Sequence, residues 1–249
     1  RVGHRPAQGR LTTETRLRKR ARAAMYFHPL HSPDSSQIGY LLADLDEQEA
    51  VVIDPPPRQT ELILALLTER SLRLCHVLRT HVHRVDAADC SALCDCTSAR
   101  LVVGEAAALP QGCSSEAMRV AHGTRLVFGN EVVRVLSTPG HTPGCLSYLW
   151  RDRLFCGDAF DVGSCCAGDG EADPGALFDT LTRRLFTLPE QTLVFPAHPI
   201  KGRHVATLGE LRARYAPRLQ QSRDGFITDM MQRRPRGATP RIAAPTAGS

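Results

Sequence analysis

Polar residues that could bind a metal ion follow four short apolar segments of the chain. They are His81 and His83 after the first segment, His141 after the second, Asp158 after the third and His198 after the fourth. Each begins a loop, and loops at the strand ends of a rigid scaffold are where functional sites are built. Imidazole and carboxylate groups are ligands of zinc, iron and manganese. The pattern therefore predicts one metal site assembled from residues far apart in the sequence.

Each of these positions also has an ordinary structural explanation. His81 and His83 could be a surface pair at a strand end, and His141 a turn residue between two Pro-Gly steps. Asp158 could cap a helix or stabilise a turn, and His198 could be a loop histidine. One context repeated four times in order favours a shared site over four unrelated explanations.

The segments around these residues predict an α+β fold. Alternating and β-branched apolar runs predict three hairpins, over 38–44 with 50–56, 124–128 with 132–137, and 146–150 with 153–156. Shorter apolar runs predict strands at 74–79, 100–103 and 192–195. Helical spacing of apolar residues predicts helices at 61–70, 86–97, 176–187, 205–215 and 222–232. Hairpins interspersed with helices indicate an α+β or αββα sandwich.

The composition is that of one large domain with an ordinary core. The chain has 249 residues, of which 42% are hydrophobic and 23% are charged. No apolar run approaches the roughly 20 residues that a transmembrane helix needs, and no signal-peptide core stands near the start. We therefore expect no membrane partner.

The net charge of +5 is concentrated at the start of the chain. Residues 1–24 contain eight Arg or Lys and one Glu, so the other 225 residues sum to −2. A nearly neutral body lacks the basic patch of a nucleic-acid-binding protein, and we expect no nucleic-acid partner.

We expect three segments: a basic, disordered leader at 1–24, a folded domain at 25–232 and a loose Pro/Arg/Ala-rich tail at 233–249. Two other interpretations of the leader stay open. Its Arg-rich, acid-poor composition is typical of a mitochondrial transit peptide, and translation could instead begin at Met25. The expected location is the cytoplasm, or the mitochondrial matrix if the leader is a transit peptide.

The nine cysteines follow no regular framework, so we expect free thiols rather than disulfides. Cys90, Cys94 and Cys96 could imitate a structural zinc cluster, but no second Cys or His pair stands at zinc-finger spacing. We expect Cys94 and Cys96 to act as small hydrophobic residues on a helix and loop.

Four sequence segments, THVH, STPGHTPGC, FCGDAF and VFPAH, resemble the metallo-β-lactamase superfamily in their order and spacing. More narrowly, the chain resembles the persulfide dioxygenase (ethylmalonic encephalopathy protein) branch and its neighbour, glyoxalase II. The segments that carry this resemblance are SPDSSQIGYLLAD, VVIDPP, TPGHTPGCLSYLW, LFTLPEQTLVFPAHPIKGR and YAPRL, and it covers residues 25–232. It implies the α+β, αββα four-layer metallo-β-lactamase sandwich.

The resemblance also implies which residues hold the metal. His81, His141 and Asp158 match the mononuclear set of the dioxygenase branch, and they would be both its metal ligands and its catalytic residues. Two histidines and one carboxylate are associated with non-haem Fe(II). The expected cofactor is one Fe(II) per chain, with zinc as the alternative.

The superfamily motif His-X-His-X-Asp-His is altered in this chain. Val85 stands at the Asp position and Asp86 at the last His position. A valine cannot bind a metal, so we expect a second metal site to be empty or weak, which counts against a dinuclear glyoxalase II. His83, Asp86 and His198 would instead hydrogen-bond the ligands or bound water and tune the metal.

The implied activity is that of a mononuclear non-haem iron sulfur dioxygenase, which oxidises a low-molecular-weight persulfide such as glutathione persulfide to sulfite and thiol. Two alternatives stay open: a zinc-dependent thioester hydrolase of glyoxalase II type, and a catalytically impaired member of the fold that acts as a binding protein. The expected partner is a small thiol or persulfide substrate, and the chain could form a homodimer.

The chain departs from the dioxygenase branch near the expected substrate pocket. The branch has Gly-Cys-Gly-Arg-Thr-Asp after the metal aspartate, where this chain has CCAGDGE (165–171) without an arginine. Ile200 stands where the branch has a tyrosine. Arg218 matches an arginine near the thiol-peptide ligand, and Lys201 is a weaker match. Arg218 could equally be a surface residue on a helix connection.

Overall fold

The computed structural model describes residues 25–83, 92–109, 117–160 and 172–233, which form two six-stranded mixed sheets. The first sheet has the order β1-β2-β3-β4-β5-β6, with strands at Met25–His31, Ile38–Asp44, Glu49–Ile53, Arg73–Leu78, Arg100–Gly104 and Met118–Val120. The second has the order β12-β11-β10-β9-β8-β7, with strands, from β7 to β12, at Arg125–Phe128, Glu131–Ser137, Leu146–Trp150, Arg153–Gly157, Leu193–Pro196 and Ala206–Thr207.

The burial of alternate side chains shows how the two sheets stack. In β2, Leu41 and Ala43 pack with Ile63 of a helix, whereas Tyr40 and Leu42 pack against the second sheet. Successive side chains of a strand point to opposite faces, so a strand buried on both faces lies between two layers. The second sheet is likewise covered on its outer face, where three further helices pack.

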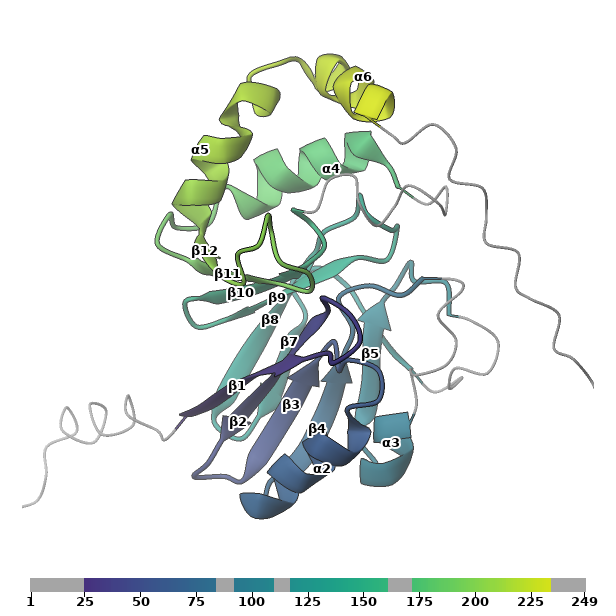
Figure 1. Cartoon of the computed structure of the whole chain (residues 1–249), viewed down its shortest axis with the longest axis vertical. Coiled ribbons are helices and arrows are strands. Elements are labelled where there is room, and N and C mark those ends of the chain that lie inside the picture. Colours follow the sequence, from purple (N-terminus) through teal and green to yellow (C-terminus); the bar gives the residue numbers. More distant parts are fainter. Residues whose placement is uncertain (1–24, 84–91, 110–116, 161–171, 234–249) are drawn as a thin grey trace, which may run out of the picture.

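The helices therefore form the two outer layers of an αββα sandwich. Figure 1 shows α2 and α3 beside the first sheet and α4 to α6 beyond the second. The structure confirms the predicted α+β four-layer fold. The helices span Thr60–Glu69 (α2), Ala92–Thr97 (α3), Pro174–Thr180 (α4), Leu208–Leu219 (α5) and Arg223–Arg233 (α6), and α4 continues as a π-helical turn over Leu181–Leu185.

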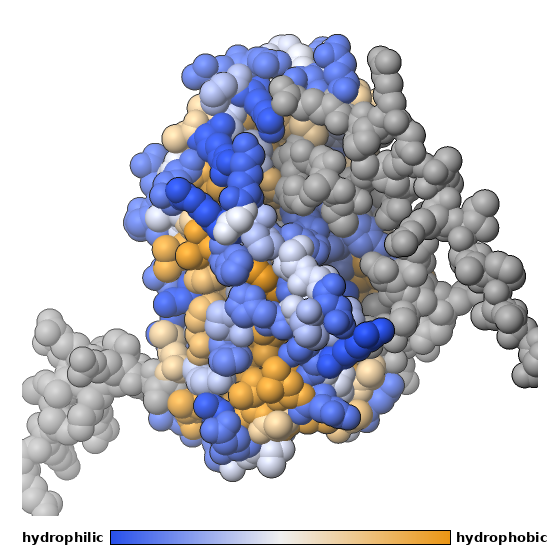
Figure 2. Space-filling view, in the orientation of Figure 1, coloured by the Kyte–Doolittle hydropathy of each residue, from blue (hydrophilic) through white to orange (hydrophobic). Residues whose placement is uncertain are grey.

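The outer surface of α2 is partly apolar. Leu62 is exposed while Ile63 and Leu67 on the opposite face are buried in the core. In Figure 2 hydrophobic side chains gather over the lower part of the molecular face that is drawn, where Figure 1 places α2. In the part of the chain that the structure describes, no helix is both long and apolar enough to cross a membrane.

The three predicted hairpins are confirmed as β2–β3, β7–β8 and β9–β10. The helix expected at 205–215 was placed too early, because Ala206–Thr207 pair with β11 and α5 begins only at Leu208. Thr207 ends the strand as a helix cap: its hydroxyl accepts from the backbone N–H of Glu210, whose carboxylate accepts from the N–H of Thr207.

Three short or edge strands, β1, β6 and β12, were not predicted. β1 contains Pro29 and is mostly half-buried, β6 has three residues and β12 has two, so none shows a clear alternating pattern. The helix predicted at 86–97 is confirmed over α3, which carries Cys94 and Cys96. The leader, the tail, and residues 84–91, 110–116 and 161–171 lie outside the described residues.

Candidate metal centre

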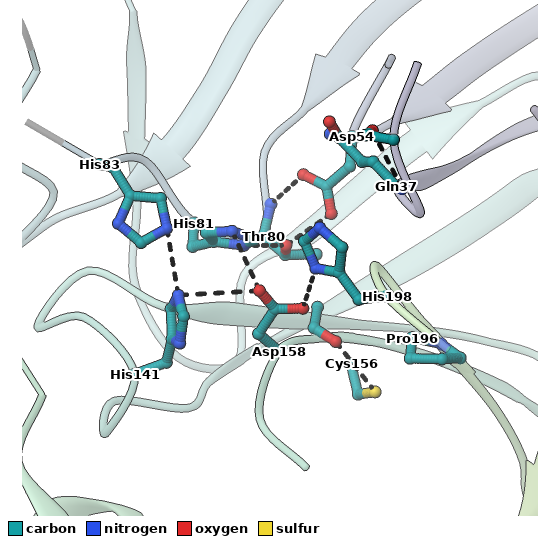
Figure 3. A network of polar contacts seen from close by, with 12 residues as sticks. Gln37, Asp54, Thr80, His81, His83, His141, Cys156, Asp158, Pro196 and His198 are labelled. Carbon is teal, nitrogen blue, oxygen red and sulfur yellow. Dashed lines mark hydrogen bonds and ion pairs between the residues drawn. The ribbon is translucent and has the colours of Figure 1, made fainter. Parts of the chain in front are cut away.

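The strand ends bring the predicted metal-binding residues together at one edge of the sandwich (Figure 3). His81 and His83 follow β4, and His141 lies in the loop between β8 and β9. Asp158 and His198 follow β10 and β11, which are parallel neighbours and so end side by side. The predicted convergence of these five side chains is what the structure shows.

Four atoms that could bind a metal face one another at the centre, one from each of His81, His83, His141 and Asp158. The Nε2 atoms of His141 and His83 are 3.2 Å apart, and Asp158 Oδ2 lies 3.5 Å from His81 Nε2 and 3.7 Å from His141 Nε2. Metal bonds of about 2.0–2.2 Å place neighbouring ligand atoms about 3.0–3.6 Å apart. The three histidines alone already form a cluster able to hold a metal ion.

The Asp158 carboxylate gives an independent test of whether a cation fits here. Its Oδ2 atom is buried and accepts no hydrogen bond within the described part of the chain. A buried carboxylate oxygen without a donor is costly. Because this oxygen faces the nitrogens of His81 and His141, a metal ion between them would satisfy it.

The electrostatics keep these groups in the protonation states that metal binding requires. Burial would raise the pKa of Asp158, but the hydrogen bond with His198 and the nearby histidines lower that pKa to about 2. Burial lowers the pKa of His81 to about 4, against the opposing pull of Asp158. At neutral pH the carboxylate is ionised and the His81 ring is neutral, as metal ligands must be.

His198 orients the carboxylate. Its Nδ1 atom lies 2.8 Å from Asp158 Oδ1 and donates to it in the tautomer that makes this bond. This contact leaves Oδ2 facing His81 and His141 (Figure 3). The contact agrees with the predicted hydrogen-bonding role of His198. How the ligand and hydrogen-bonding roles divide among the five residues stays a prediction, since the Nε2 atom of His83 also lies 3.2 Å from that of His141.

His141 is held by the packing of its loop. Gly140 has a φ of +141°, and a Cβ there would lie 2.6 Å from Cα of Leu177 in α4. The backbone N–H of Asp173 donates to the carbonyl of Gly140 at 2.9 Å, and the Thr180 hydroxyl donates to the carbonyl of Pro139 at 2.7 Å. On the other side, a Cβ at Gly144 would meet the backbone of Ala107 at 2.5 Å. Only glycines allow the loop this close to its neighbours.

Asp54 and Thr80, which lie directly behind His81, were not predicted from the sequence. Asp54 is 3% exposed and Thr80 is 1% exposed, and the Thr80 hydroxyl lies 2.5 Å from Asp54 Oδ2 and 2.9 Å from His81 Nδ1. The sequence signal was present: Asp54 follows β3, the parallel neighbour of β4, in the same strand-end context as the other site residues.

The residues predicted to bind substrate lie outside this cluster. Arg218 of α5 forms an ion pair with Asp229 of α6 at 4.0 Å. Lys201 is exposed in a turn and lines an open cavity of about 470 Å³ with Arg203 and Arg214. Hydrogen bonds and ion pairs among the described residues link neither Arg218 nor Lys201 to the metal-binding side chains.

Ile200 is 8% exposed and packs in the outer core with Leu208 and Leu211. Val85, Asp86 and the CCAGDGE segment lie outside the described residues. The role predicted for Asp86 therefore stays a prediction.

The comparisons with known proteins agree with this geometry. The human mitochondrial persulfide dioxygenase ETHE1 is 30% identical over 212 residues, covering 84% of this chain and 81% of the human protein. The crystal structure of ETHE1 from Myxococcus xanthus is 38% identical, with a TM-score of 0.70, and covers 83% of this chain and 90% of that one. The chain belongs to the persulfide dioxygenase (ETHE1-like) branch of the metallo-β-lactamase superfamily.

The hydroxyacylglutathione hydrolases match less of the chain than the ETHE1-like proteins do. Hydroxyacylglutathione hydrolase from Cereibacter sphaeroides is 32% identical over 166 residues, which are 66% of this chain and 63% of the hydrolase. A crystal structure of TTHA1623 in a di-iron-bound form is 26% identical, with a TM-score of 0.53, and covers 78% of this chain and 94% of that one. A scan against protein-family models finds none that matches this ETHE1-like chain.

Proposed function

We propose that this protein is a mononuclear, iron-dependent sulfur dioxygenase that oxidises a low-molecular-weight persulfide, such as glutathione persulfide. The observation that carries the proposal is the meeting of Asp158 Oδ2 with the Nε2 atoms of His81 and His141 at 3.5 and 3.7 Å. Membership of the persulfide dioxygenase branch supports the same reaction class.

The donor set favours iron. Two imidazoles and one carboxylate on one face form the set associated with non-haem Fe(II) and leave positions open for other ligands. When bound, Fe(II) would supply open positions for a persulfide sulfur and O₂ and could pass electrons from one to the other. The iron-bound state of the related TTHA1623 supports iron over zinc.

The protein's own residues prepare this site in three ways. Asp158 supplies a full negative charge, since its pKa of about 2 keeps it ionised. His198 holds that carboxylate in place through its 2.8 Å contact. His141 is 3% exposed and His83 is 8% exposed, so both rings lie largely out of bulk water.

The overall reaction balances as RSSH + O₂ + H₂O → RSH + SO₃²⁻ + 2H⁺. The outer sulfur is oxidised, the S–S bond breaks, and the inner sulfur leaves as the thiol. One O₂ is therefore consumed for each sulfite formed. No electron donor besides the persulfide is needed.

Thioester hydrolysis is the second candidate, because Asp158 and His198 are among the residues that would hold a second metal. The hydroxyacylglutathione hydrolase relatives and the di-iron form of TTHA1623 favour it. Hydrolysis by a metal-bound hydroxide consumes water and no oxygen. Oxygen uptake therefore separates the two reactions.

The test is to purify the protein without oxygen, measure its metals, and assay it with glutathione persulfide and with a glutathione thioester. We expect about one iron per chain and one O₂ per sulfite with the persulfide. His141→Ala should lose both metal and activity, whereas His122→Ala, which changes an exposed histidine on the β6–β7 turn, should keep both. Two zinc ions with thioester hydrolysis, or no activity with either substrate, would contradict the proposal.

A further inference from the structure

Thr80 contacts all three segments that supply the predicted metal ligands. It directly precedes His81, and its carbonyl accepts a 2.7 Å hydrogen bond from the N–H of Leu146, at the end of the His141 loop. A Cβ at Gly157, next to Asp158, would lie 2.4 Å from the Thr80 hydroxyl oxygen. Thr80 thus lies between the end of β4, the start of β9 and the end of β10.

Asp54 holds Thr80 through two hydrogen bonds. The backbone N–H of Thr80 lies 2.8 Å from Asp54 Oδ1, and the Thr80 hydroxyl lies 2.5 Å from Asp54 Oδ2. Asp54 has a φ of +44°, a conformation that few side-chain-bearing residues adopt without support. Its strained backbone and complete burial point to a positional requirement at this residue.

The hydrogen atoms in this chain of contacts can be assigned. The hydroxyl of Thr80 has one proton and donates it to Asp54 Oδ2 at 2.5 Å, so that proton points to Asp54. The hydroxyl oxygen then has lone pairs but no proton for His81 Nδ1, which lies 2.9 Å away. Nδ1 must therefore carry the ring proton and donate it, which leaves Nε2 with a lone pair facing Asp158 and His141 (Figure 3).

We propose that Asp54 and Thr80 are positioning residues that fix His81 in the tautomer protonated at Nδ1, with its Nε2 lone pair directed into the metal centre. This inference rests on the proposed metal site, but it does not depend on which metal binds there or which reaction follows. Partners of this kind fix the orientation of a metal-binding imidazole and raise metal affinity.

The direct test is the ¹⁵N NMR spectrum of the metal-free protein labelled at histidine, recorded near pH 8, with His81→Gln used to assign the signals. The two ring nitrogens have different shifts when protonated and unprotonated. The wild-type protein should show Nδ1 protonated and Nε2 unprotonated at His81. A ring protonated at Nε2, or an equal mixture of both tautomers, would overturn the proposal.

Thr80→Val keeps the shape of the side chain but removes the hydroxyl, so it should shift His81 toward the mixture of tautomers seen in free imidazole. Zn²⁺ affinity should fall by about 10- to 100-fold. Thr80→Ser restores a hydroxyl and should recover both properties. Asp54→Asn should resemble Thr80→Val.

Thr68→Val is the matched control, because the Thr68 hydroxyl bonds only within the exposed face of α2. It should leave the tautomer and the Zn²⁺ affinity unchanged. An unchanged Zn²⁺ affinity and tautomer in folded Thr80→Val would count against the proposal. Zinc binding without persulfide oxidation would leave this inference standing while refuting the proposed function.

Discussion

His81 and His141 face the same centre but are held there by different physical means. Side-chain hydrogen bonds fix His81, through Thr80 and Asp54 on its own sheet. Close packing fixes His141. Gly140 lets its loop lie close against α4, and Gly144 lets it lie close against the end of β5. His81 should therefore be sensitive to chemical changes in its neighbours, and His141 to changes in their volume.

Gly140→Ala should have the largest effect on stability, because it disturbs the packing that holds the His141 loop. The added Cβ would meet Leu177 at 2.6 Å in a backbone conformation that disfavours side chains. We expect the free energy of unfolding to fall by about 2–4 kcal/mol, measured by urea denaturation. Gly123→Ala is the control: Gly123 also has a positive φ, but nothing lies within 4 Å of its added Cβ. Equal losses in the two variants would show that packing does not hold the His141 loop.

The pH dependence of stability should come next and should report on His81. Its pKa is lowered from 6.5 to about 4 in the folded state, chiefly by burial. The unfolded chain therefore takes up this proton first as the pH falls, so stability is lost from about pH 6.5 downward and the loss is complete below about pH 4. We expect His81 to contribute at most about 3 kcal/mol to that loss in metal-free protein.

Urea denaturation of metal-free protein between pH 7.5 and 4.5 would measure this loss, with His81→Gln as the comparison. The variant should show a shallower pH dependence than wild type over this range. Parallel curves would contradict the neutral state assigned to His81.

A smaller effect is expected for Thr180→Val, which removes the hydrogen bond from α4 to the carbonyl of Pro139 but keeps the side-chain shape. The loss in stability should be about 1 kcal/mol. Metal affinity should change less than in Thr80→Val, because the packing around Gly140 remains. If Thr180→Val lowered metal affinity more than Thr80→Val does, a hydrogen bond would matter more for His141 than for His81, contrary to the difference described above.

Arg218→Ala should have the smallest effect on stability, because Arg218 lies outside the groups that hold His81 and His141. Its ion pair with Asp229 spans 4.0 Å at a partly exposed site, so its loss should cost less than about 1 kcal/mol. If Arg218 binds the substrate, as predicted, KM for glutathione persulfide should rise with kcat nearly unchanged. Steady-state oxygen uptake would measure both constants, and an unchanged KM would remove Arg218 from the substrate site.

Much of this architecture could be predicted because the strongest sequence signals are local. The β2–β3 and β9–β10 hairpins show in runs of apolar residues, and the metal-binding residues follow strands directly. The residues that follow the strands were predicted to converge. This prediction held because β3 with β4, and β10 with β11, are parallel neighbours. Strands that are parallel neighbours end at the same edge, so the residues after them meet.

The parts that escaped prediction depend on contacts between distant residues. Asp54 bonds to Thr80, 26 positions away, and beside three prolines it was interpreted only as the end of a strand. The short strands β6 and β12 are defined by their partners rather than by their own sequences. The close approach of Gly140 to Leu177 is likewise visible only once α4 is in place.

The most direct test of the central claim is native mass spectrometry of the protein loaded anaerobically with Fe(II), for the wild type, His83→Ala and His141→Ala. A lone ion held by His81, His141 and Asp158 predicts one iron in the wild type, one in His83→Ala and none in His141→Ala. Two irons in the wild type, or loss of the metal from His83→Ala as complete as from His141→Ala, would contradict it.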